Sequence, residues 1–167
     1  MATESAHAAS KRPRSILAGP YGHPFHSILV TIPIGAWIAS LVFDIVAIVG
    51  DDAEAFATGA RWLIGIGLIG AVLAAVAGLL DYSVLAAGTR AKRVALIHML
   101  LNLTVVVLLT IGFFVRLGVE GVSVAGIVLS VISLLLLGVS GFLGGELAYR
   151  FGVRVADEKT QREAFEG

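Results

Sequence analysis

The chain has 167 residues, of which 57% are hydrophobic and only 14% carry a charge, and its formal net charge is zero. A soluble domain needs roughly a quarter of its residues charged to cover its surface, so this composition excludes a soluble protein built around one large core. The absence of cysteine excludes disulfides, thiolate metal sites and iron–sulfur clusters.

Residues 1–21 form a polar, basic N-terminal arm without the apolar stretch of a cleavable signal, so we expect the first apolar run to be retained. Four runs almost free of charge follow, at about 27–49, 61–80, 94–117 and 122–147. Each is long enough to cross a hydrocarbon core of about 30 Å as a helix. Backbone groups in lipid must be satisfied within a segment, so the runs predict helices. We therefore predict an all-α membrane protein: a four-transmembrane-helix antiparallel bundle over 22–155, with a polar tail at 156–167.

The basic residues predict the orientation of this bundle. Ten of them fall on the side that holds both termini and the central loop, and only Arg61 and Arg116 fall on the other. This asymmetry is a positive-inside signal, so both termini should be cytoplasmic. The bases are spread over several segments, which offers lipid headgroups a surface and indicates no nucleic-acid partner.

The first span opens with His23 and His26 and contains Pro33 in its interior. Proline cannot donate to the carbonyl four residues earlier, so Pro33 should bend this helix. Thr31 is placed to satisfy part of the exposed backbone.

Polar residues from four distant stretches should gather at the cytoplasmic end, because helices one and three begin there and helices two and four end there. Polar side chains at membrane depth are costly and usually face the bundle interior, so each is a candidate site residue. The set is His23, His26, Asp81, His98, Asn102 and Glu146.

Three interpretations of the histidines remain open. They cap helix mouths and contact headgroups; or they hold a metal, with His23, His26 and His98 and either Asp81 or Glu146 as ligands, His26 and His98 first among them; or imidazoles from two helices bind a b-type haem axially. Small residues recur along the second span from Gly67 to Gly78, which favours close helix packing. Gly144 and Gly145 serve the same packing or make room for a flat ligand.

Asp44 lies inside the first span, toward the opposite side. Arg61 and Arg116 are its candidate partners at a similar depth. We favour a structural ion pair that locks three helices together over a proton path.

Four ordered motifs, "GHPFHSILVTIPIGAWIASLVFDIV", "AGLLDYSVL", "ALIHMLLNL" and "GGELAYRFGVRV", together resemble the bacterial membrane family called domain of unknown function 2231. The resemblance covers about residues 22–155. It implies a four-helix integral-membrane domain that in some relatives accompanies Rieske-type iron–sulfur modules, and no established activity. The matching positions are His23, Pro24, His26, Pro33, Asp81, His98, Asn102, Gly144, Gly145 and Tyr149.

Our leading hypothesis is a redox-associated module of the bacterial plasma membrane. It would hold a b-type haem, or a quinone headgroup, at a site of His23, His26, Asp81, His98, Asn102, Gly144 and Gly145. The alternative is a structural or partner-binding membrane subunit, with a small transporter ranked last. The chain has no nucleophile elbow and no phosphate-binding loop, so we assign no catalytic residue. Expected partners are the lipid bilayer and either a redox membrane protein or a second copy of the chain.

Overall fold

The computed structural model describes residues 2–19 and 22–166. Within these residues four helical segments are long and apolar enough to cross a membrane: Phe25–Val49, Ala53–Ser83, Arg90–Leu117 and Val124–Arg150. The predicted all-helical fold with four spans is therefore confirmed. The first span consists of α2 (Phe25–Leu29) and α3 (Thr31–Val49), and the second and third are α4 (Ala53–Ser83) and α5 (Arg90–Leu117). The fourth joins α6 (Val124–Gly145) to a wide π-helical turn, η3 (Glu146–Arg150).

Side-chain caps set where three of these helices begin. Asp52 accepts a hydrogen bond from the amide of Ala55 at 3.1 Å, and Thr89 accepts one from Lys92 at 3.2 Å. Ser123 does the same for Gly126 at 3.2 Å. Each cap satisfies an amide that has no partner within the helix. Because Asp52 and Thr89 precede the apolar runs, α4 and α5 start earlier than hydropathy predicts.

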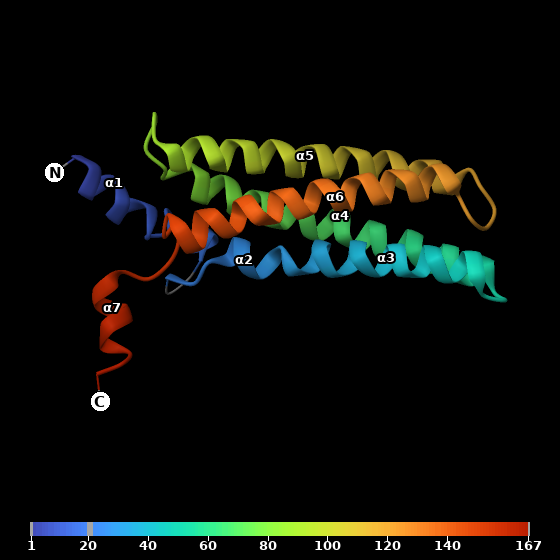
Figure 1. Cartoon of the computed structure of the whole chain (residues 1–167), viewed down its shortest axis with the longest axis horizontal. Coiled ribbons are helices and arrows are strands. Elements are labelled where there is room, and N and C mark those ends of the chain that lie inside the picture. The colour runs from blue at the N-terminus through green and yellow to red at the C-terminus, as the bar shows by residue number, and fades with distance from the viewer. Residues whose placement is uncertain (1, 20–21, 167) are drawn as a thin grey trace.

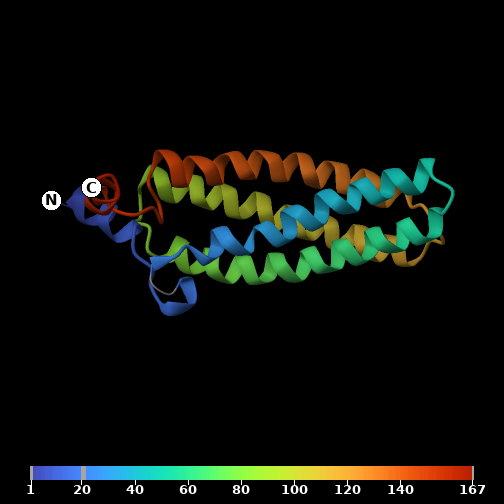
Figure 2. The same ribbon diagram turned by 90° about the horizontal axis from the view of Figure 1, so that it is seen from below.

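The helices form an antiparallel bundle made of two tight pairs. α3 packs along α4, and α5 packs along α6 (Figures 1 and 2). Both chain ends lie at one end of the bundle, beside the start of α2 and the end of α4 (Figure 1). This confirms that the termini share a side; that this side is the cytoplasm stays a prediction.

The pairs meet around Trp37, Ile64, Val105 and Leu109, all of which are buried. The Trp37 indole donates from Nε1 to the Ile64 carbonyl at 3.3 Å and packs where Gly67 has no side chain. The predicted role of Gly67 in helix packing is thus confirmed. Large apolar side chains such as Ile69, Leu135 and Phe142 cover the outside of the bundle. A soluble protein would hide such side chains, whereas lipid accepts them.

The first span is interrupted at Val30, between α2 and α3. Pro33 follows one turn later and cannot donate to the carbonyl of Leu29. Thr31 donates from its hydroxyl to the Ile28 carbonyl at 2.7 Å and so restores a backbone partner nearby. The interruption that Pro33 predicts is present, and it separates α2, which carries His26, from α3.

Among residues 2–19 and 22–166, three short elements lie outside the spans: α1 (Ala2–Ser10), η1 (Ile16–Ala18) and α7 (Glu158–Glu163). Asp157 caps α7 by accepting hydrogen bonds from the amides of Thr160 and Lys159. The Thr160 amide is the main cause that lowers the pKa of the Asp157 carboxyl from its ordinary value. The tail therefore carries an ordered helical turn rather than only the polar stretch expected from composition.

Candidate functional site

His26 lies on α2, half-buried against α4. Its Nδ1 is 2.9 Å from the carbonyl oxygen of Ala74. A carbonyl only accepts, so Nδ1 carries the proton and Nε2 of the neutral ring keeps its lone pair. The ring fits over Gly78, where an added Cβ would come within 3.0 Å of the imidazole. A glycine on α4 thus makes room for this histidine.

His98 occupies the equivalent place in the other helix pair. It lies on α5, and its Nδ1 is 2.8 Å from the carbonyl oxygen of Ser140 on α6. An added Cβ at Gly144 would lie 3.1 Å from Cε1 of the imidazole. Each histidine therefore donates to the backbone of its partner helix and rests on a glycine of that helix.

Asn102 lies one turn deeper on α5, beside the His98 ring. Its Nδ2 is 2.7 Å from Ser140 Oγ, 2.9 Å from the His98 carbonyl oxygen and 3.2 Å from His98 Nε2. A side-chain amide has two hydrogens, and the two shorter contacts use both. Asn102 Nδ2 also lies within hydrogen-bonding distance of the His98 Nε2 lone pair, and the Ser140 hydroxyl is a second donor to the His98 carbonyl at 3.2 Å.

The two imidazoles face one another across the boundary between the helix pairs. Their ring centroids are 6.2 Å apart and their planes are nearly perpendicular, at 88°. The prediction that the topology brings His26 and His98 together at the terminal end is confirmed by this distance.

Asp81 closes α4 at the same end, but its partner is Arg154 rather than a histidine ring nitrogen. Arg154 Nε lies 2.9 Å from Asp81 Oδ1, with both side chains largely buried. The same guanidinium donates to the carbonyl oxygens of Ala18 at 3.1 Å and His23 at 3.3 Å. Asp81 thus joins α4 to the segments before α2 and after η3.

Sequence reasoning missed Arg154, which it counted only among the basic residues that orient the bundle. Arg154 has a left-handed backbone, with φ of 60°, and its side chain reaches Asp81 at the end of α4. The "GVRV" run that ends the fourth motif was the sequence signal that could have identified Arg154. His23 contributes its carbonyl to this contact, and its exposed side chain lines a cavity of about 620 Å³ between α1 and the C-terminal segment.

Of the remaining predicted residues, Glu146 and Gly145 lie apart from the imidazoles and Gly144 does not. Glu146 accepts from Arg90 at 3.2 Å and from Arg150 at 3.3 Å. Gly145 has open space where a Cβ would stand, and Gly144 is occupied by the His98 ring. The flat group at Gly144 is the imidazole itself, whereas a flat ligand at Gly145 stays a prediction.

A metal site of three or more protein ligands is not formed by the described residues, since no three His, Asp or Glu side chains there come together suitably. The Asp81 carboxylate pairs with Arg154, and the Glu146 carboxylate pairs with arginines. Among the described residues, His26 and His98 are therefore the two predicted metal ligands that lie close to each other without an ion-pair partner.

A family model described as "Predicted membrane protein (DUF2231)" matches residues 22–157, most of the chain. The chain belongs to the DUF2231 family. No curated protein and no solved structure matches it. The resemblance drawn from the four motifs is therefore confirmed, and this DUF2231 protein is a multi-pass membrane protein.

At the opposite end of the DUF2231 bundle a buried ion pair joins the two helix pairs. Arg116 Nη2 on α5 is 2.7 Å from Asp44 Oδ2 on α3 and 3.0 Å from Ser130 Oγ on α6. The Asp44 and Arg116 side chains are only 4% and 3% exposed. Of the two predicted partners, Arg116 is correct and Arg61 is wrong, because Arg61 donates instead to the Thr58 hydroxyl at 2.7 Å.

The glycine seat of His98 can be tested by adding one methyl group. Gly144→Ala should lower the free energy of unfolding by about 1–3 kcal/mol, since the Cβ would push the imidazole from the Ser140 carbonyl. Gly145→Ala is the matched control, because it gains the same helix propensity and meets nothing within 4 Å. Thermal unfolding in detergent compares the two, and equal stability would show that Gly144 does not seat His98.

Proposed function

We propose that this DUF2231 protein is a redox-associated module of the bacterial plasma membrane that holds a b-type haem between His26 and His98. The observation that carries the proposal is the pair of perpendicular imidazoles, 6.2 Å apart between ring centroids, contributed by the two helix pairs. Two imidazoles bound to one metal at about 2 Å per bond place their centroids roughly 6 Å apart. Haem proteins use such axial histidines on facing helices.

The hydrogen bonds of the two rings support the same proposal. Each Nδ1 donates to a main-chain carbonyl, at 2.9 Å for His26 and 2.8 Å for His98. Bonds of this kind select the tautomer, orient the ring and raise the basicity of Nε2, the nitrogen that binds iron.

The donor set also favours a haem over the other predicted ligands. A bare metal ion such as zinc takes four ligands, whereas the described residues bring together only two imidazoles. A porphyrin supplies four nitrogens of its own and needs only the two axial ones. A quinone headgroup would draw on Asp81, which is engaged by Arg154.

A haem bound here would supply one-electron transfer. His26 and His98 would hold the iron, the carbonyls of Ala74 and Ser140 would keep the Nδ1 protons in place, and the apolar bundle would exclude water. The site lies near one end of the bundle, where an electron could pass to a redox partner in the same membrane.

A second candidate function, a structural or partner-binding subunit, rests on a different observation. The bond from His26 joins α2 to α4, and the bond from His98 joins α5 to α6. These contacts stabilise the bundle whether or not a ligand is present.

Absorbance of the purified protein separates the two functions. Protein from haem-replete cells should show a Soret band and a reduced-minus-oxidised difference spectrum, and the pyridine haemochrome should give haem b. His26→Ala and His98→Ala should each abolish both signals, because each removes one axial ligand. His7→Ala, in the N-terminal arm, is the control and should leave the spectrum unchanged.

A colourless wild-type preparation would overturn the haem proposal. The structural candidate then predicts that His26→Ala and His98→Ala each lower the unfolding temperature in detergent, with no bound ligand to lose. Unchanged stability in both variants would count against that candidate as well.

A further inference from the structure

The turn η1 exposes two large apolar side chains at the end of the bundle. Ile16 is 79% and Leu17 74% exposed, although the next residue, Ala18, is completely buried. The turn thus packs on one side and displays hydrophobic groups on the other. An exposed apolar pair of this kind marks an interaction surface.

The turn is held firmly to the bundle. Ala18 and Gly19 donate to the carbonyls of Ser15 and Ile16 at 3.0 and 3.1 Å. Arg154, anchored on Asp81, donates to the Ala18 carbonyl. The turn that carries Ile16 and Leu17 is therefore linked to α4 through Arg154.

The position of the turn is level with the ends of the spanning helices. η1 contacts α4 and α2, and Figure 2 shows this blue segment projecting sideways past the green ribbon of α4. α1 and α7 instead extend beyond the end of the bundle (Figure 1). In a bilayer crossed by these four helices, a segment at the level of their ends would meet the boundary between headgroups and acyl chains.

Exposed basic residues accompany the apolar pair. Arg12 and Arg14 precede η1 by two to four residues and both are exposed. Basic side chains beside apolar ones are typical of segments that lie in a membrane interface and prefer anionic lipids.

We propose that residues 12–17, the anchor turn, dock on an anionic lipid surface. Ile16 and Leu17 enter the boundary between headgroups and acyl chains, and Arg12 and Arg14 meet lipid phosphates. η1 contacts α4, a spanning helix with exposed apolar side chains, and this contact together with the two arginines favours an anionic lipid surface as the occupant. The inference is independent of whether a haem is bound.

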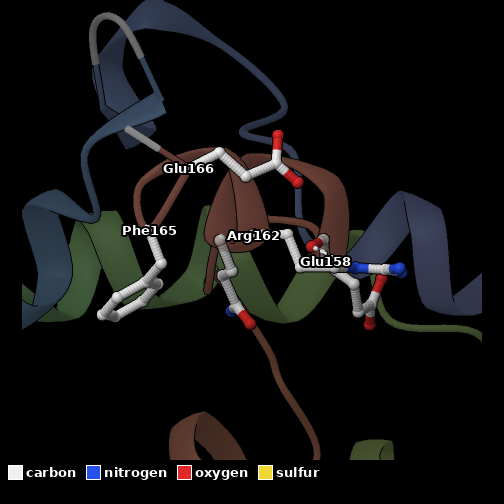
Figure 3. A pocket seen from close by; sticks show the side chains of 5 residues that line it. Glu158, Arg162, Phe165 and Glu166 are labelled. Carbon is white, nitrogen blue, oxygen red and sulfur yellow. Dashed lines mark hydrogen bonds between the residues drawn. The ribbon is translucent and has the colours of Figure 1, made fainter.

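The absence of cysteine from the chain makes a direct test available. Ile16→Cys and Leu17→Cys, each spin-labelled in the full chain in bilayer nanodiscs containing phosphatidylglycerol, should be more accessible to oxygen than to a water-soluble nickel complex. Phe165→Cys is the matched control, because Phe165 is 93% exposed but lies just after α7, beside Glu158, Arg162 and Glu166 (Figure 3). Its label should favour nickel.

The charge contribution is tested with Arg12→Gln and Arg14→Gln in the labelled chain. Each substitution should lower the equilibrium constant for insertion of the labelled anchor turn roughly fivefold in phosphatidylglycerol, because each removes one basic side chain near the surface. The same constant should change much less in phosphatidylcholine. Nickel access at 16 and 17 equal to that at 165 would overturn the proposal. So would a short label-to-label distance between two copies, since a second chain would then cover the turn.

Discussion

Asp44→Ala is expected to lower the free energy of unfolding by about 3–5 kcal/mol, because it leaves Arg116 buried without its counter-charge. The guanidinium would keep only the Ser130 hydroxyl at 3.0 Å and the Gly112 carbonyl at 3.3 Å as partners. Neither neutralises a charge inside an apolar bundle. Unfolding in detergent micelles, followed by circular dichroism, measures the loss.

Two further variants make this prediction specific. Asp44→Leu combined with Arg116→Met should recover most of the stability, since a buried ion pair can be replaced by apolar groups of similar size at little net loss. Asp51→Ala is the control, because Asp51 is exposed in the following loop and should change stability by less than about 0.5 kcal/mol. Wild-type stability in Asp44→Ala would show that the pair does not clamp the two helix pairs.

Arg154→Ala is expected to cost about 3 kcal/mol, near the lower end of the range for breaking a buried pair. It removes the partner of Asp81 and the donor to the Ala18 and His23 carbonyls. Amides of residues 15–19 should also exchange faster with deuterated solvent, because η1 loses its link to α4. Unfolding in detergent and hydrogen exchange of the same samples provide the two measurements.

Arg150→Ala is the comparison for Arg154. Its side chain is 65% exposed and its pairing with Glu146 spans a single helical turn. Such exposed pairs contribute about 0–1 kcal/mol, so the variant should fold and exchange like wild type. If Arg154→Ala behaves the same way, the Asp81–Arg154 contact has no anchoring role.

The spans were predictable because lipid imposes a strict rule on the backbone. A charge-free run of sufficient length must be helical, and four such runs with short connections must alternate in direction. That alternation alone brings His26, Asp81 and His98 to one end. The sequence therefore determined the fold class, the shared side of the termini and the approach of the two histidines.

Which side chains contact each other was not predictable from the sequence, because these contacts depend on how each helix is rotated about its axis. Gly144 and Gly145 are neighbours in sequence, yet about 100° around the helix separates them. One seats His98 and the other faces open space. Asp44 had two arginines at similar depth, and only the packing of α3 against α6, which itself packs along α5, selects Arg116.

The contacts of Arg154, which lies outside the helices, were likewise not predictable from the sequence. Its left-handed backbone, with φ of 60°, follows from contacts with Ser10, Ala18 and Asp81, which are far away in sequence. The sequence by itself determined which residues reach the terminal end of the bundle. Only the tertiary structure decided which of them touch, because side-chain partners are set by helix rotation and loop conformation rather than by hydropathy.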